Sequence, residues 1–296
     1  MTATSTQPRT LERVPAPLLV MVAIGSVQCG SALARGLFDD LGAAGITLLR
    51  LGLAALLLLV ALRPKVRSWS REAWRAAVLL GCVMAGMNLV FYLAIRTVPL
   101  GVAVTVEFVG PLLLALVQTR RAVDLLWALL AAGGVVLLGA DTASNIPLQG
   151  LALALLAGMF WAGYIVAGAH VGRTLPGTDG LAVALAVATL IVRPFGARGA
   201  AEVLHRPSLL LPAFGVAVLS SVLSYGFELS ALRRIPTRVF GILMSLEPAA
   251  AAVAGLLFLG QRLHLREVTA LLMVSAASAG VTLGRRATEV PAQPLE

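Results

Sequence analysis

Three charged residues lie deep inside long apolar runs of the sequence: Arg50, Glu107 and Glu247. A charged side chain near the centre of a membrane span costs about 3 kcal/mol, so such residues usually have a role in binding or transport. A buried carboxylate can bind an ammonium group or a transported proton, and an arginine can hold a carboxylate through two parallel hydrogen bonds. The alternative, open above all for Arg50, is that each side chain only locks its helix to a polar neighbour.

Each of the two glutamates is accompanied by a proline. Pro111 follows Glu107 by four residues and cannot donate a hydrogen bond to its carbonyl group. Pro248 directly follows Glu247 and cannot donate to the carbonyl group of Met244. Each proline therefore predicts a free carbonyl group and a kink. We expect both carboxylates to lie roughly 10 Å deep, approaching the midplane from opposite sides, where irregular backbone lines a water-filled cavity or is buried in protein.

Further polar and aromatic side chains interrupt the apolar runs. Glu228 is predicted to reach the headgroup region near Arg233 and Arg234. Five uncharged residues join the three charged ones as candidate substrate- or proton-binding residues: Gln28, Asn88, Tyr92, Trp161 and Tyr164. Each of the five, taken alone, is explained by packing or hydrogen bonding between helices, but together they suit a small polar ligand.

The motifs of catalysis and of nucleotide or metal binding are missing from the sequence. It contains no GxxxxGK loop, no HExxH motif and no nucleophile elbow. Cys29 and Cys82 lie inside apolar runs without metal-like spacing, and the three histidines do not cluster with them. We therefore predict no enzymatic activity, no cofactor and no metal site.

The composition is typical of a protein embedded in a lipid bilayer. Hydrophobic residues make up 59% of the chain and charged residues only 12%, against roughly a quarter charged in a soluble domain. A span needs about 20 apolar residues. The sequence therefore predicts an all-α polytopic membrane protein with ten transmembrane helices, at 18–35, 42–62, 74–95, 101–118, 125–140, 149–169, 181–192, 209–232, 239–259 and 268–284.

The net charge of +9 is explained by membrane topology, and we predict no nucleic-acid partner. Nearly all basic residues lie in the short gaps between apolar runs. About fifteen fall on the side of the N-terminus and about seven on the other side, which favours two cytoplasmic termini. The segment Ala32-Leu33-Ala34 resembles a signal-peptidase site. Cleavage there would break the internal repeat described next, so we expect the first run to be retained.

The chain contains an internal repeat. The segment 94–99 recurs as 231–236, and Pro111 and Pro248 follow the two copies at the same distance. Repeats with an odd number of spans insert with opposite orientation, and such folds usually bind substrate near the midplane between the repeats. We predict a cytoplasmic N-terminal tail at 1–17, five-helix repeats at 18–140 and 149–284, and a cytoplasmic C-terminal tail at 285–296.

Three segments resemble the drug/metabolite transporter superfamily with two EamA-type repeats. They are SVQCGSALARGLF from Ser26, GMNLVFYLAIRTVPLGVAVTVEFVGPLLLAL from Gly86 and RRIPTRVFGILMSLEPAAAAVAGLLFLG from Arg233. The resemblance implies ten helices in a bacterial inner membrane and a central cavity lined largely by helices 1, 3, 4, 6, 8 and 9. It also implies export of threonine or homoserine driven by the proton gradient.

The same resemblance implies that Glu107, Glu247, Asn88 and Tyr92 line the cavity. One position departs from the family pattern, because relatives usually carry Gly-Glu where this chain has Gly260 followed by Gln261. This difference puts in doubt whether the role of that glutamate is kept here.

The residues and the resemblance together predict a secondary transporter that exports a small amino acid, similar to threonine or homoserine, in exchange for protons. A second hypothesis keeps the fold and changes the substrate to another metabolite or a lipophilic drug. A third is a membrane scaffold without transport. The sequence is equally compatible with a monomer and a homodimer.

Overall fold

The computed structural model describes residues 14–118, 122–139, 146–175, 178–232, 234–235 and 237–284. The predicted C-terminal tail and most of the N-terminal tail lie outside these residues. Within the described residues the chain forms helices and no strands, which confirms the all-α class. In chain order the helices are α1 (Ala16–Gly36), α2 (Phe38–Leu62), α3 (Arg71–Ala94), α4 (Leu100–Glu107), α5 (Val109–Gln118), α6 (Ala122–Gly139), α7 (Leu148–Thr174), α8 (Asp179–His205), α9 (Leu210–Ala217), α10 (Ser224–Leu232), α11 (Thr237–Met244), α12 (Glu247–Leu259) and α13 (Leu265–Gly284).

Nine helical stretches of the described residues are long and apolar enough to cross a membrane. Six are the single helices α1, α2, α3, α7, α8 and α13. Three are composite: α4 with α5, α9 with α10, and α11 with α12. The predicted run at 125–140 forms α6, whose apolar part Leu125–Leu138 is shorter than the other stretches. The chain is therefore a multi-pass membrane protein, and the count of ten spans stays a prediction.

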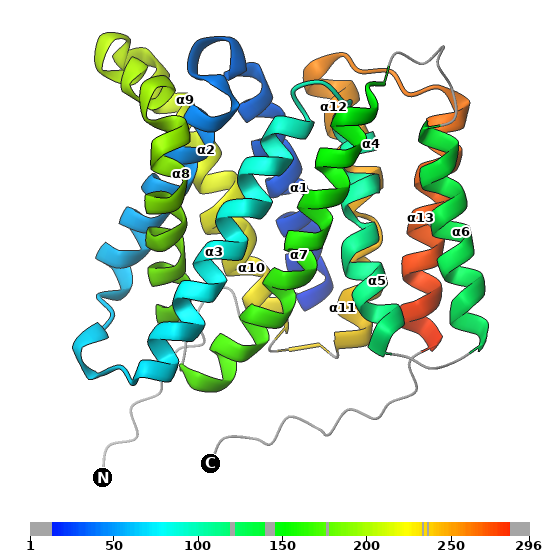
Figure 1. Ribbon diagram of the computed structural model, residues 1–296, viewed down its shortest axis with the longest axis horizontal. Helices are drawn as coiled ribbons and strands as arrows, with labels where there is room; N and C mark the ends of the chain where they lie inside the picture. The colour runs from blue at the N-terminus through cyan, green and yellow to red at the C-terminus, as the bar shows by residue number, and fades with distance from the viewer. Residues whose placement is uncertain are drawn as a thin grey trace.

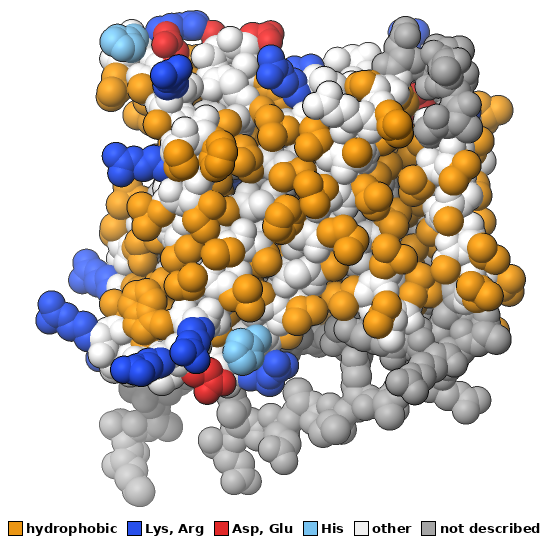
Figure 2. Space-filling model, in the orientation of Figure 1, with side chains coloured by type: hydrophobic (Ala, Val, Ile, Leu, Met, Phe, Trp, Pro, Cys, Tyr) orange, Lys and Arg blue, Asp and Glu red, His pale blue; other side chains and the backbone are white. Residues whose placement is uncertain are grey.

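The helices stand side by side as one bundle, and α1 begins at the same end of it at which α13 finishes (Figure 1). Hydrophobic side chains cover the middle of the face in Figure 2, whereas most charged side chains gather near the two ends. This distribution matches an apolar belt in contact with lipid chains and polar ends in contact with headgroups and water.

Helices from the two halves of the chain pack against each other throughout the bundle. Helix α2 packs against α8, α3 against α7, and α1 against α10. In the same way α4 packs against α12, and α6 against α13. Many buried residues at these contacts are alanines, since small side chains let neighbouring helices approach closely where water supplies no driving force.

Helix α8 differs most from its predicted span. The apolar run ends at Val192, whereas the helix continues to His205 through Pro194. The charged residues Arg193 and Arg198 lie on its exposed side, so they do not disturb the packed side. The apolar run therefore underestimates the length of this helix, because charged residues on its exposed side interrupt the run before the helix ends.

Two of the composite spans are interrupted next to the predicted glutamates. Helix α4 ends at Glu107 and α5 begins at Val109, so Pro111 lies in the first turn of α5. Helix α11 ends at Met244 and α12 begins at Glu247. Both glutamates thus occupy the end of a helix inside a membrane-spanning stretch, a position that broken helices of transporters use for binding sites.

The α4–α5 junction packs closely against α7 through Gly110 and Gly158. A Cβ atom on Gly158 of α7 would lie 2.2 Å from the carbonyl oxygen of Glu107. A Cβ atom on Gly110 would lie 1.8 Å from the carbonyl oxygen of Gly158. No side chain fits at these points, so the two glycines set how deeply the α4–α5 junction is packed.

We expect Gly158→Ala to lower the free energy of unfolding by about 1–3 kcal/mol, because the added methyl group must displace backbone. Gly168→Ala on the same helix is the matched control, since no atom lies within 4 Å of its Cβ position. That control is expected to be neutral or stabilising by up to about 1 kcal/mol, because alanine is the better helix former. Thermal unfolding of the purified variants in detergent measures both, and equal melting temperatures would contradict the close contact.

Candidate functional site

Arg50 of α2 points into the bundle and is only 4% exposed. Its Nε donates to Ser221 Oγ at 3.1 Å, Nη1 to the Tyr92 hydroxyl at 3.0 Å, and Nη2 to the Ser220 carbonyl oxygen at 3.1 Å. The guanidinium group also lies 5.2 Å from the ring centre of Tyr92. It carries more N–H donors than these bonds use, and no described carboxylate forms an ion pair with it. Arg50 is thus a buried cation whose hydrogen-bond partners among the described residues are all neutral.

Two of these partners come from a π-helical segment, Val218–Leu223, between α9 and α10. A π-helical turn inside an α-helix is often found at a functional site, because it changes where backbone and side-chain groups point. Here it places the Ser220 carbonyl oxygen and the Ser221 hydroxyl toward Arg50. Neither serine is among the candidates predicted from the sequence, although two adjacent polar residues in an otherwise apolar run are a signal.

Glu247 opens α12 and is 7% exposed. Its Oε1 accepts a hydrogen bond from Nε2 of Gln28 at 3.2 Å, which joins α12 to α1. The second oxygen of the carboxyl group, Oε2, and the amide oxygen of Gln28 are both buried and have no partner among the described residues. A buried acceptor without a donor is costly, so this pair is incomplete in the structure.

Glu107 lies at the end of α4 and is 8% exposed. It interacts electrostatically with Glu247 and with Arg50. Its carboxyl group forms no hydrogen bond with the described residues. The two candidate glutamates and the candidate arginine, which are far apart in the sequence, are therefore brought into one electrostatic cluster.

Glu228 of α10 belongs to this cluster as well. It interacts electrostatically with Glu247, and its Oε1 accepts a hydrogen bond from Ser224 Oγ at 3.2 Å. From the sequence, Glu228 was predicted to reach the headgroup region near Arg233 and Arg234. Arg233 lies outside the described residues, and the side chain of Arg234 donates to the Val14 carbonyl oxygen. The structure thus brings a third carboxyl group into the candidate site.

The remaining candidates form an uncharged side of the same region. The Asn88 side chain donates to the Met84 carbonyl oxygen at 2.8 Å and also interacts with Tyr225. The rings of Tyr225 and Tyr164 lie 6.1 Å apart. Trp161 packs edge-on against Phe108, at the α4–α5 junction, with 5.2 Å between ring centres. Tyr225 also interacts with Arg50 and was missed by the sequence analysis.

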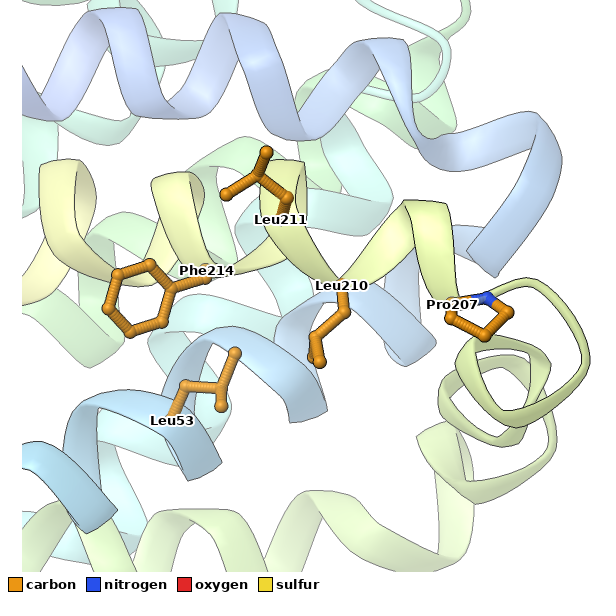
Figure 3. A pocket seen from close by; sticks show the side chains of 5 residues that line it. All are labelled: Leu53, Pro207, Leu210, Leu211 and Phe214. Atoms are coloured by element: carbon orange, nitrogen blue, oxygen red, sulfur yellow. The ribbon is translucent and has the colours of Figure 1, made fainter.

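A separate apolar groove between α2 and α9 does not fit a polar ligand (Figure 3). Its volume is about 350 Å³, and it is lined by Leu53, Pro207, Leu210, Leu211 and Phe214. None of these side chains can bind a charged group, and Leu210, Leu211 and Phe214 are exposed on the outside of the bundle. The buried charged cluster is therefore the candidate functional site.

Gln261 contacts the N-terminal end of α4, opposite to the end that carries Glu107. Its Oε1 accepts a hydrogen bond from the Leu100 backbone N–H at 2.9 Å, and its own N–H donates to the Gly255 carbonyl oxygen. Pro99 precedes α4 and offers no side-chain cap. Gln261 therefore caps the helix that carries Glu107, and a glutamate at this position would offer an equivalent acceptor.

The cluster has the chemistry to bind a small molecule that carries both charges. Arg50 has free donors for an anionic group, and Glu247 with Gln28 has free acceptors for a cationic one. The residues come from helices of both halves of the chain, namely α1, α2, α3, α4, α7, α10 and α12. No part of the described chain brings together the histidines, cysteines and carboxylates of a metal site.

Comparison with known proteins gives consistent results. The EamA-like transporter family matches residues 148–283. The threonine/homoserine exporter RhtA of Salmonella typhimurium is 44% identical over 269 residues, which cover 90% of each chain. RhtA of Escherichia coli strain K12 is 43% identical over 282 residues, covering 93% of this chain and 95% of that one.

A crystal structure of a protein with 18% sequence identity superimposes with a TM-score of 0.58. The match covers 90% of this chain and 96% of that chain. At this identity the similarity concerns the fold alone.

The hydrogen bond between Arg50 and Tyr92 leads to a stability prediction. Tyr92→Phe removes an acceptor from a buried cation and is expected to destabilise the protein by about 1–3 kcal/mol. Tyr164→Phe is the matched control, because its hydroxyl has no hydrogen bond with the described residues. Thermal unfolding in detergent compares the two variants; if Tyr164→Phe were the more destabilised, the assigned partner of Arg50 would be wrong.

The cap formed by Gln261 leads to a second stability prediction. Gln261→Leu is expected to cost about 0.5–2 kcal/mol, because the Leu100 N–H loses its acceptor. Gln261→Glu keeps an acceptor at the positive end of a helix dipole and should be near neutral. The same unfolding assay measures both substitutions, and an equal loss in both would show that the cap contributes nothing.

Proposed function

Because the chain belongs to the EamA-like transporter family, we propose that it is a secondary transporter that exports a small amino acid such as threonine or homoserine. The proteins named threonine/homoserine exporter RhtA match it over about nine-tenths of its length. Its relatives are transporters, so it is not an enzyme. The substrate assignment extends the name of these relatives to this chain.

The observation that carries the proposal is a buried cation, Arg50, that forms no ion pair within the described residues and lies in one cluster with a buried carboxyl group, Glu247, that forms none there either. Removing an ion from water costs several kcal/mol, and a partner of opposite charge offsets much of that cost. A zwitterionic amino acid supplies both missing charges. Its carboxylate binds the free N–H groups of Arg50, and its ammonium group binds at the glutamates.

The proposed architecture is ten transmembrane helices in two inverted repeats, 18–140 and 149–284, with α6 as the fifth span. The packing of the bundle supports it. The second span (α2) packs against the seventh (α8), the fourth (α4–α5) against the ninth (α11–α12), and the fifth (α6) against the tenth (α13). The third span (α3) packs against the sixth (α7), and the first (α1) packs against the eighth (α9–α10). A twofold axis relating the repeats would produce this pattern.

We further propose that transport is coupled to protons across the bacterial inner membrane, with both termini in the cytoplasm. Glu107 or Glu247 binds the substrate ammonium when the site faces the cytoplasm and a proton when it faces outward. The two repeats rock about the site to expose it to each side in turn. The inward flow of protons then drives the amino acid out.

Reconstituted protein in proteoliposomes with an imposed pH gradient tests the function. We expect threonine or homoserine flux that depends on the gradient and is lost in the double variant Glu107→Gln/Glu247→Gln. Arg50→Met is expected to weaken substrate binding by about 2–5 kcal/mol, because a buried charge contact is removed. Arg206→Met, at an exposed ion pair with Asp40, is the matched control and should transport normally.

The outcomes separate the hypotheses. Flux of lipophilic cations with none of amino acids would replace the substrate assignment with a drug or another metabolite. Full threonine flux in the double glutamate variant would show that the carboxyl groups do not couple transport. Absence of flux for every solute, from correctly folded protein, would favour a scaffold.

A further inference from the structure

Gln28 and Glu247 form an incomplete pair between α1 and α12. Both are almost fully buried, at 3% and 7% exposed. A hydrogen bond of 3.2 Å joins Gln28 Nε2 to Glu247 Oε1. The opposite oxygen of each group, Gln28 Oε1 and Glu247 Oε2, has no described partner. The pair therefore presents two buried acceptors and lacks the donors that would satisfy them.

The chemistry of the missing donors is limited. Neutral donors would satisfy the hydrogen bonds but leave the charge of an ionised Glu247 uncompensated. A primary ammonium group carries a positive charge and several N–H donors on one atom, so it can bond a carboxylate oxygen and an amide oxygen together. A secondary or acylated amine has fewer donors, and an acylated one has no charge.

A proton satisfies the same pair when no substrate is bound. If Oε2 of Glu247 carries the proton, it becomes a donor for an adjacent amide oxygen, while Gln28 Nε2 continues to donate to Oε1. The carboxylic acid and the amide then satisfy each other. A proton and an ammonium group therefore compete for the same place.

The surrounding charges favour Glu247 over Glu107 for this exchange. Glu107 interacts with Arg50 as well as with Glu247, so it already has a positive neighbour. The charged groups that interact with Glu247 are Glu107 and Glu228, and both are acidic. The polar side chain from α1 that faces it is Gln28, which is neutral. Of the two candidate glutamates, Glu247 is thus the one without a positive neighbour among the described residues.

We propose that Gln28 and Glu247 together form the ammonium subsite, and that the substrate ammonium displaces a proton from Glu247 as it binds there. On the cytoplasmic side the O–H bond of Glu247 breaks, the proton passes to water, and the ammonium group takes its place. On the outer side the reverse exchange releases the amino acid. At this subsite one positive charge replaces another at each step, while the substrate carboxylate adds a negative charge that Arg50 offsets. This inference rests on the proposed function and assigns a part of its site.

Proton release on binding tests the exchange in the unmodified protein. Purified protein in weakly buffered detergent solution is mixed with threonine or with N-acetylthreonine, which lacks the ammonium group. We expect threonine to release protons in proportion to the sites filled, and N-acetylthreonine to bind roughly tenfold more weakly or worse and to release none. Threonine binding without proton release, at every pH tested, would overturn the inference.

Variants identify the groups involved. Glu247→Gln is expected to abolish proton release, whereas Glu107→Gln keeps it. Gln28→Met, which retains size without hydrogen-bonding groups, should weaken threonine binding by roughly tenfold or more and leave N-acetylthreonine binding unchanged. Gln149→Met makes the same chemical change at an exposed position of α7 and should alter neither ligand.

These experiments distinguish failure of the ammonium subsite from failure of the proposed function. If the unmodified protein neither binds nor transports threonine or homoserine, the proposed function itself is wrong. If it transports them but Gln28→Met weakens both ligands equally, or neither, the ammonium subsite is wrong and the function stands. If Gln28→Met does not fold, the proton-release comparison of the two ligands on the unmodified protein, together with Glu247→Gln and Glu107→Gln, still decides the question.

Discussion

The fold is organised around charges that are buried in the bundle and form no ion pair within the described part of the chain. Arg50 is satisfied by a phenol hydroxyl, a serine hydroxyl and a backbone carbonyl group, while three carboxyl groups lie in electrostatic contact nearby. A direct ion pair would be more stable but would close the site to a charged ligand. The neutral partners keep the cation in place and leave its charge available.

The irregular parts of the backbone supply what this arrangement needs. The π-helical segment gives Arg50 two of its hydrogen-bond partners. The α4–α5 junction places Glu107 at the end of α4, and the α11–α12 junction places Glu247 at the start of α12. Close packing of Gly110 and Gly158 fixes the first junction, and Gln261 from the second half of the chain caps α4. The site therefore exists only when both halves are folded together.

The sequence was sufficient to find three of the four charged members of the candidate site, Arg50, Glu107 and Glu247, because a charge in an apolar run is costly and stands out. Glu228 was placed at the headgroups instead. The sequence did not indicate which side chains would meet, and it could not show that Gln28 pairs with Glu247 across 219 residues. Ser220, Ser221 and Tyr225 were missed because hydroxyl groups cost little in a span, and a π-helical turn leaves no clear mark in the residue pattern. The end of α8 was misjudged because Arg193 and Arg198, on its exposed side, interrupt the apolar run while the helix continues.

Electron cryomicroscopy of the protein with threonine or homoserine bound would locate both charged ends of the ligand. We expect ligand density inside the bundle, with its carboxylate at the guanidinium group of Arg50 and its ammonium group at Glu247 and Gln28. Density in the apolar groove beside Leu53 and Phe214, or a direct ion pair between Arg50 and a glutamate in the bound state, would contradict this placement.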